Sequence, residues 1–492
     1  MRHLFFTGAS GLLGGQLLAR LLDHGRQVAV LVRPTAKASG RERIESILLA
    51  EEQILGKILP RPVVLEGDLT SPQCGLGDQE VQWVRRACSS ILHSAASLEF
   101  TGPDRSGEPW RTNVSGTQNL LDLAKETGID EFHHVSTAYV CGLSPGPIEA
   151  TASDGAYGFR NDYEASKHQA EWLVRKAPFL RNPTFYRPGV IVGDSRTGAT
   201  LTYHGMMAML QLMTVIVRNL PADETGFRKV SLRLSMTGNE KRNMIPVDWV
   251  AAVITRLLNT SESRGQTFHL TPEHPITIRE IIDFTSSYLH SGGVEFYGAQ
   301  TPSELNDTEN AAYGGKGLYE AYEHTDPVFN TDSLKQFAED LPCPIIDEAM
   351  IHRFLAFGDA DRWGKRKRPR PKIDSWAGDL LGQLDSEGLI AFARAVAGGR
   401  TASPPSAIGI ECVGPGGGSW TIRRTSNSSA LLEQGLQNHH HLFSLSCGDI
   451  LQLVQNSGHG ISALQQTPLL NASRETTSVG SPTIGSRKVA AS

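Results

Sequence analysis

Several kinds of protein are disfavoured by what this sequence has little of. Its 492 residues include six scattered cysteines, with no Cys-x-x-Cys pair and no spacing typical of metal ligands. A disulfide scaffold and a zinc ribbon therefore do not fit, and no metal site is expected. A net charge of −5 provides no basic excess for binding nucleic acid or an anionic membrane. We expect neither partner.

Long hydrophobic runs are also missing. No stretch approaches the roughly 20 apolar residues that cross a bilayer, and the most apolar window, 201–217, is interrupted by Tyr203, His204 and Gln211. The apolar run near the first residue is too short for a secretion signal and leads directly into a glycine loop. The sequence predicts a cytoplasmic protein without an integral membrane segment, and it leaves the oligomeric state open.

The first third of the chain alternates β-rich runs with amphipathic helical patterns. The β-rich runs are nearly continuous hydrophobes, as expected of parallel strands buried on both faces. They lie at 3–7, 27–32, 62–65, 90–93, 132–136 and 184–187, and the helical patterns include 12–22, 113–126 and 162–176. This alternation predicts an α/β fold with a doubly wound parallel (Rossmann-type) sheet, a helical substrate cap and a small C-terminal α+β module.

At roughly 150 residues per domain, the length suits about three units. We expect a dinucleotide-binding domain at 1–275, in which 201–242 is a cap insertion and the segments 243–258 and 267–270 return to the main sheet. The later parts are expected to be a cap extension at 276–364, a basic and Pro/Ser linker with a helix at 365–406, an α+β module at 407–471 and a disordered tail at 472–492. Four methionines between Met206 and Met213 either line an acyl channel or pack the cap.

A glycine-rich loop follows the first predicted strand and opens an apolar helix. This context fits dinucleotide binding, with one glycine for the turn, one for close approach of the pyrophosphate and one for helix packing. The helix N-terminus then faces the phosphate charge. The expected contacts in this loop are Thr7, Gly8, Ser10, Gly11, Leu12 and Gly14.

Arg33 ends the second predicted strand, where an acidic residue would hold the ribose 2′-hydroxyl of NADH. An arginine instead suits the 2′-phosphate of NADPH, so we predict NADPH over NADH. Lys37 and Arg41 lie nearby, but their placement depends on the loop. Further cofactor contacts are expected at later strand ends: Asp68, Leu69, Ala95, Ala96, Pro188 and Val190.

Tyr163 and Lys167 stand four residues apart on one face of a predicted helix. A neighbouring ammonium favours the phenolate, which would bring the tyrosine closer to proton transfer at neutral pH. The lysine also suits the nicotinamide ribose. Thr137, at the end of the fifth predicted strand, is the expected second hydroxyl on the substrate oxygen, with Ser136 as the alternative. We therefore predict Thr137, Tyr163 and Lys167 as the catalytic set.

Other reactive side chains receive simpler interpretations. Cys141 has no histidine placed to activate it and is expected to be a packing residue. His133–His134 and His439–His441 lack complementary metal ligands. Asn113 begins an Asn-x-Ser triplet, which has no meaning as a glycosylation site in a cytoplasmic chain.

Several motifs occur in the order found in the extended short-chain dehydrogenase/reductase superfamily, which the chain resembles over about 1–275. They are TGASGLLG, GDLT, HSAAS, NVSGTQNLL, VSTAYVCG, YEASK and YRPGVIVG. The segments LVRP, EGDLTSPQCGLG, ILHSAASLEF and NMIPVDWV are similar to the thioester-reductase branch, which includes fatty acyl-CoA reductases. The C-terminal module weakly resembles sterol-carrier-type lipid-binding domains through GGGSWTI and LFSLSCGDILQLV.

The resemblance implies reduction of an acyl thioester, carried on CoA or an acyl-carrier protein, by NADPH. Thr137 and Tyr163 would hold the oxyanion, and the product would be an aldehyde or an alcohol. A sugar-nucleotide epimerase or a hydroxysteroid-type dehydrogenase would use the same tyrosine and lysine and stays an alternative. A non-catalytic NADP-binding regulatory protein is the third, although such proteins usually lose one of these two residues.

Overall fold

In the computed structural model of this chain, residues 2–457 are described except for 152–154, 299, 301, 303, 314–323, 367–372, 374, 375, 398–405 and 427. Most of the predicted basic run, most of the Pro/Ser linker and the whole of the predicted tail lie outside the described residues.

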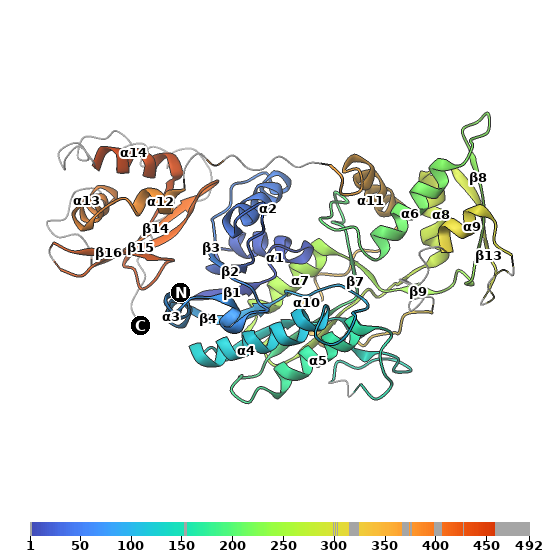
Figure 1. The fold of residues 1–492 in the computed structure, drawn as a ribbon, viewed down its shortest axis with the longest axis horizontal. Coiled ribbons are helices and arrows are strands. Elements are labelled where there is room, and N and C mark those ends of the chain that lie inside the picture. Colours follow the sequence, from blue (N-terminus) through green and yellow to red (C-terminus); the bar gives the residue numbers. More distant parts are fainter. Residues whose placement is uncertain are drawn as a thin grey trace.

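A seven-stranded parallel sheet forms the centre of the larger part of the molecule (Figure 1). Its strand order is β11-β6-β5-β4-β1-β2-β3. The strands are β1 (His3–Thr7), β2 (Val28–Val32), β3 (Val63–Glu66), β4 (Cys88–His93), β5 (Glu131–Val135), β6 (Thr184–Pro188) and β11 (Thr267–Leu270). All seven correspond to segments expected from the sequence, which confirms the doubly wound α/β fold.

Helices cover both faces of this sheet. Strand β1 shows why, because Leu4 and Phe6 belong to one hydrophobic core and Phe5 to the other. The first core receives helices α1 (Leu12–Asp23), α2 (Gly40–Leu55), α7 (Val247–Leu258) and α10 (Asp332–Ala338). The second receives α3 (Asp78–Ala87), α4 (Gly116–Thr127) and α5 (Asp162–Lys176).

The strand order reverses direction between β1 and β4. In an open parallel sheet, the carboxyl ends of the strands on either side of such a reversal form a crevice. The loops after β1 and β4 therefore frame the expected binding site.

A second unit, which we call the cap, is built from segments on both sides of α7. Its core contains Met206, Met207 and Met213, so these methionines pack the cap interior rather than line an open channel. Its main elements are α6 (Met206–Asn219), β8 (Arg228–Leu234), α8 (Ile278–Tyr288), β13 (Ser291–Phe296), α9 (Asp307–Tyr313) and α11 (Glu348–Ala360), with β8 paired to β13.

Two short ribbons connect the cap to the main sheet. Strand β7 (Val190–Val192) pairs with β10 (Met244–Pro246), and β9 (Lys241–Arg242) pairs with β12 (Ile276–Thr277). The expectation that 243–258 returns to the main sheet is therefore wrong for its strand. β10 lies in a separate two-stranded sheet, although its Ile245 and the apolar side chains of the following helix α7 belong to the core on one face of the main sheet.

The C-terminal unit has its own four-stranded sheet, in the order β16-β15-β14-β17. Its elements are α12 (Ala377–Leu381), α13 (Ser386–Val396), β14 (Ala407–Val413), β15 (Gly418–Arg424), β16 (Ala430–Gln434), β17 (His441–Ser446) and α14 (Cys447–Ser457). From the sequence, α12 and α13 were expected to be one helical piece of the linker. They are two helices, and both pack into the core of this unit because their apolar faces cover its sheet.

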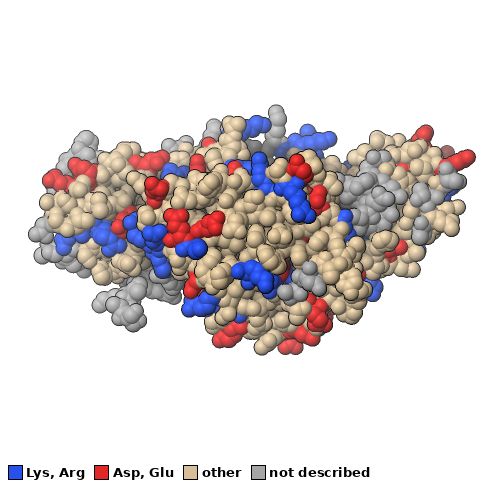
Figure 2. Space-filling model, turned by 60° about the horizontal axis from the view of Figure 1, so that its bottom comes forward, with Lys and Arg blue, Asp and Glu red and all other residues tan. Residues whose placement is uncertain are grey.

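The C-terminal unit contacts the main sheet unit through polar groups. Trp83 Nε1 donates to Gln434 O at 2.6 Å, and Gly414 N donates to Leu59 O at 3.3 Å. On the face shown in Figure 2, basic side chains lie in small groups beside acidic ones. In the described part of the chain, no helix has the length and apolarity required to traverse a bilayer.

Candidate active site

The loop between β1 and α1 lies tightly against the strand end of β4. Gly8 has a φ of +85°, and a Cβ at this position would lie 2.5 Å from Ala95 N. A Cβ on Gly14 would lie 1.9 Å from Gly8 O. These two positions therefore require glycine, one for its backbone conformation and one for the close approach of helix α1.

A cavity of about 500 Å³ opens over this loop at the reversal of the strand order. Nine of the predicted cofactor residues line it: Thr7, Gly8, Ser10, Gly11, Arg33, Asp68, Leu69, Ala95 and Ala96. The structure thus brings together residues from four strand ends that are far apart in the sequence.

The other predicted cofactor residues are not part of this lining. Leu12 begins α1, and Gly14 packs beneath the loop rather than facing the cavity. Pro188 ends β6, and its carbonyl lies 3.4 Å from Thr137 Oγ1. Val190 lies in β7 and packs against the cap core. Of these, only Pro188 is placed directly at the predicted catalytic residues.

Two arginines converge at the outer end of the cavity. Arg33 lies 3.7 Å from Asp68 in an exposed ion pair, whereas Arg43 on α2 donates to Ser10 Oγ at 3.0 Å and also to Arg33 O. Burial and the positive charge of Arg33 lower the pKa of Arg43. A bound anion would offset this repulsion.

Arg43 was not predicted from the sequence, which offered Arg41 instead. Arg41 points away from the cavity, toward Asp379 and Trp376 of the C-terminal unit. The sequence does hold a signal that could have identified Arg43. Ser39 is the N-cap of α2 and forms a capping box with Glu42, so the start of the helix, and with it the direction of each side chain, is defined.

The predicted catalytic hydroxyls meet beyond the cavity, at the carboxyl end of β5. Thr137 caps the one-turn helix Ala138–Cys141, and Tyr163 lies in the first turn of α5, whose N-cap is Asn161. The Thr137 side chain lies beside the Tyr163 hydroxyl, close enough to stabilise its charged form. Thr137 is therefore the hydroxyl residue that the structure places next to Tyr163.

The pKa of Tyr163 differs from the sequence-based expectation. Burial raises it to about 12, and the nearby Thr137 side chain lowers it only in part. The expected lowering by Lys167 is absent because the Lys167 ammonium donates to Val135 O at 2.8 Å. At neutral pH, Tyr163 is consequently a phenol that can donate a proton.

Lys167 is almost completely buried, with 2% of its surface exposed. Burial lowers its pKa to about 8, and the negative charge of Glu171, one turn along α5, opposes this. Glu171 in turn pairs with Arg187 at 2.6 Å and with Arg175 at 2.7 Å. The lysine therefore titrates close to physiological pH, in an environment set by a buried carboxylate.

A buried amide connects the cavity to the catalytic helix. Asn113 accepts from Ser97 N at 2.8 Å and donates to Ser166 Oγ at 2.9 Å. Ser97 lines the cavity, and Ser166 immediately precedes Lys167. In the sequence, Asn113 stands out only as the start of an Asn-x-Ser triplet, because nothing local to the sequence reveals a contact across 53 residues.

Cys141 and His133 have their contacts outside this site. Burial raises the pKa of Cys141 to about 11, which supports a packing role. His133 lies in β5 and contacts Tyr186 Oη at 3.0 Å and Glu131 Oε1 at 3.2 Å. Among the described residues, no cluster of three or more potential metal ligands is present.

The sequence model of the male sterility protein family matches residues 6–254, which is more than half of the chain. The chain belongs to this family. The match supports the extended short-chain dehydrogenase/reductase resemblance of the sequence and an oxidoreductase that uses a nicotinamide cofactor.

Two curated fungal proteins and one solved structure are similar to this chain. A non-canonical nonribosomal peptide synthetase, hkm10 of Aspergillus hancockii, is 28% identical in an alignment 392 residues long, which covers 72% of this chain and 36% of that protein. Aldehyde reductase lnaA of Aspergillus flavus is 26% identical in an alignment 404 residues long, which also covers 72% of this chain and 36% of that protein. The chain thus spans about a third of these relatives.

The solved structure is the terminal R domain of the myxalamid PKS-NRPS biosynthetic pathway. It is 26% identical, with a TM-score of 0.60, and the match covers 75% of this chain and 93% of that domain. Together with the family match, this likeness confirms the thioester-reductase branch that the sequence motifs indicated.

The residues present fit a dinucleotide. The cavity lies over the N-terminus of α1, and Gly8 lets the backbone come close to a bound group because it carries no Cβ. Arg33 and Arg43 place two positive charges near each other at the outer end of the cavity. A diphosphate suits the first feature and a further phosphate suits the last.

Proposed function

We propose that this chain is an NADPH-dependent reductase of acyl thioesters and that its physiological substrate is bound to a carrier protein. The observation that carries the proposal is that Thr137 and Tyr163 lie side by side, near buried Lys167 and next to a cavity that fits a dinucleotide. The similarity to a terminal R domain and to peptide synthetases supports a carrier-bound substrate over free acyl-CoA.

The cofactor residues have distinct roles in this proposal. Gly8, Gly11 and the N-terminus of α1 would hold the diphosphate, and Ala95 and Ala96 would let the cofactor lie against the backbone. Arg33 and Arg43 would hold the 2′-phosphate, which distinguishes NADPH from NADH. Lys167 would hold the nicotinamide ribose. The bound cofactor supplies the hydride.

The chain's own side chains handle the substrate oxygen. Thr137 and Tyr163 donate hydrogen bonds to the thioester carbonyl and stabilise the negative charge that develops on its oxygen. Tyr163, whose raised pKa keeps it protonated, passes its proton to that oxygen and gives a hemithioacetal. Breaking the C–S bond of the hemithioacetal releases an aldehyde and a thiol. A second reduction, with Tyr163 again as proton donor, would give the alcohol.

The test is a cofactor-consumption assay on the full chain with carrier-bound acyl thioesters, acyl-CoAs, aldehydes, sterols and nucleotide sugars. We expect NADPH oxidation with thioesters and release of one thiol per acyl group. One NADPH per thiol indicates an aldehyde product, and two indicate an alcohol. Interconversion of a nucleotide sugar without net cofactor consumption would contradict the proposal and identify an epimerase.

Two further expectations remain predictions. One is the lipid-binding role of the C-terminal unit, and the other is the cytoplasmic location.

A further inference from the structure

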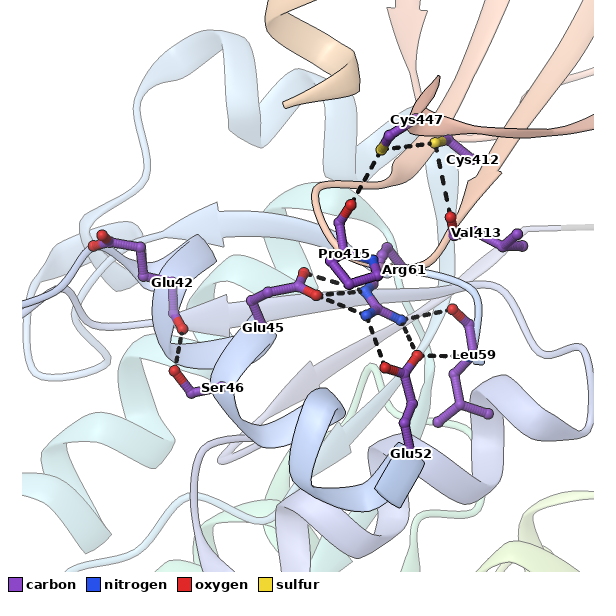
Figure 3. A network of polar contacts seen from close by, with 10 residues as sticks. All are labelled: Glu42, Glu45, Ser46, Glu52, Leu59, Arg61, Cys412, Val413, Pro415 and Cys447. Atoms are coloured by element: carbon purple, nitrogen blue, oxygen red, sulfur yellow. Dashed lines mark hydrogen bonds and ion pairs between the residues drawn. The ribbon is translucent and has the colours of Figure 1, made fainter. Parts of the chain in front are cut away.

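Two of the six cysteines lie against each other in the C-terminal unit (Figure 3). Cys412 is near the end of β14, and Cys447 is the first residue of α14. The two residues are neighbours because β14 and β17 run parallel, with Val413 paired to Ser446. Their Sγ atoms are 3.2 Å apart.

The surroundings of Cys447 make its thiol easier to ionise. Its sulfur lies within hydrogen-bond distance of Cys412 Sγ, at the N-terminus of an eleven-residue helix and near the backbone N–H of Ala377. The contacts with Cys412 and Ala377 and the positive charge of Arg61 lower the pKa of Cys447, against burial and the charge of Glu45. A thiol at a helix N-terminus near a cation is the arrangement found in reactive cysteines.

The other four cysteines lack these features. Burial raises the pKa of Cys74, Cys88 and Cys343 to about 12 and that of Cys141 to about 11. Cys412 is completely buried, and its pKa is raised by its contact with Cys447. Cys447, by contrast, keeps part of its surface exposed. The pair thus combines one accessible thiol with one protected thiol.

We propose that Cys412 and Cys447 form a reversible disulfide, with Cys447 as the attacking thiol and Cys412 as the resolving thiol. With a glutathione disulfide as oxidant, the Cys447 thiolate attacks one sulfur and releases one glutathione thiolate. Cys412 then loses its proton and attacks Cys447 Sγ, which releases the second glutathione. The two protein thiols lose two electrons and two protons in total, and the oxidant is reduced to two glutathione molecules.

The pair lies at the contact between the C-terminal unit and the main sheet unit. The Cys447 thiol donates to Pro415 O at 3.2 Å, and the adjacent Gly414 N–H bonds to Leu59 O of the main sheet unit. Arg61 also donates to Leu59 O, at 2.6 Å (Figure 3). A disulfide sulfur carries no proton, so oxidation removes the bond to Pro415 and loosens the loop that makes this contact.

The test is a thiol map of the full chain after exposure to glutathione disulfide under native conditions. Free thiols are alkylated, and the unreduced protein is digested with trypsin, which cuts after Lys and Arg and so separates Cys412 in peptide 401–423 from Cys447 in peptide 425–474. We expect four alkylated cysteines, a link between these two peptides, and loss of the link with dithiothreitol. Six alkylated cysteines, or a link between other cysteines, would overturn the proposal.

Variants assign the two roles. Cys412→Ser should accumulate a glutathione adduct on Cys447, whereas Cys447→Ser should give neither link nor adduct. Cys343→Ser, which removes a partly buried thiol elsewhere, should retain the link. Absence of the adduct in Cys412→Ser would overturn the order of attack. Amide hydrogen exchange of the loop around Gly414 should be faster in the oxidised wild-type chain, and an unchanged rate would contradict the loosening of the contact.

Discussion

Replacing Arg43 by Gln tests how the chain distinguishes its cofactor. The side chain sits at the outer end of the cavity, bonded to Ser10 Oγ at 3.0 Å and close enough to Arg33 for the two charges to repel. Of the two cofactors, only NADPH has a 2′-phosphate that would neutralise this excess positive charge. A hydrogen bond to a charged group contributes about 1.5–3 kcal/mol, so the Kd for NADPH should rise roughly 10- to 150-fold.

The assay is a fluorescence titration of the full chain with NADPH and with NADH. The Kd for NADH should change little, because NADH lacks the 2′-phosphate that this arginine would bind. Arg41→Gln is a matched control on the same helix: its side chain points to Asp379 and Trp376 instead, so it should leave both constants unchanged. An equal loss for both cofactors, or no loss for either, would refute the assignment of Arg43 to the 2′-phosphate.

Two further predictions concern buried charges. Lys167 has a pKa of about 8, so a rate that needs its ammonium should fall as the pH rises through that value. Glu171→Gln removes a charge that raises this pKa and should therefore shift the alkaline limb of the pH–rate profile to lower pH, whereas an unmoved limb would show that Glu171 does not act on the lysine. Arg61 is buried between two carboxylates, so Arg61→Met should lower the free energy of unfolding by about 3–5 kcal/mol in urea titration. Lys57→Met, which removes an exposed ion pair, should cost less than about 1 kcal/mol, and equal costs would contradict this difference.

The main sheet was predictable because strands buried on both faces leave a continuous hydrophobic run in the sequence. Strand β2 follows this pattern throughout, whereas β5 interrupts it with two buried histidines. The strand Met244–Pro246 is also apolar, but apolarity does not reveal its partner, and it pairs with β7 rather than with the main sheet. The helices α12 and α13 were placed in a linker because their partner surface, the sheet of the C-terminal unit, forms only in three dimensions.

The residues of the candidate site that could be predicted are those whose role depends only on the sequence next to them. Gly8 and the Tyr163–Lys167 spacing are of this kind. Arg43 and Asn113 were missed because their roles depend on contacts between distant segments. The pKa of Tyr163 was expected to move in the wrong direction, because the sequence shows that a lysine is near but not that its ammonium is directed to Val135 O.

The most direct test of the account is the turnover of an acyl thioester by Tyr163→Phe. This change removes the phenolic hydroxyl and keeps the ring that packs near Phe100. We predict a fall in kcat of about 10²–10⁴-fold, the usual range for loss of general acid catalysis, with the Kd for NADPH unchanged. Wild-type rates of NADPH oxidation and thiol release in this variant would show that Tyr163 does not donate the proton.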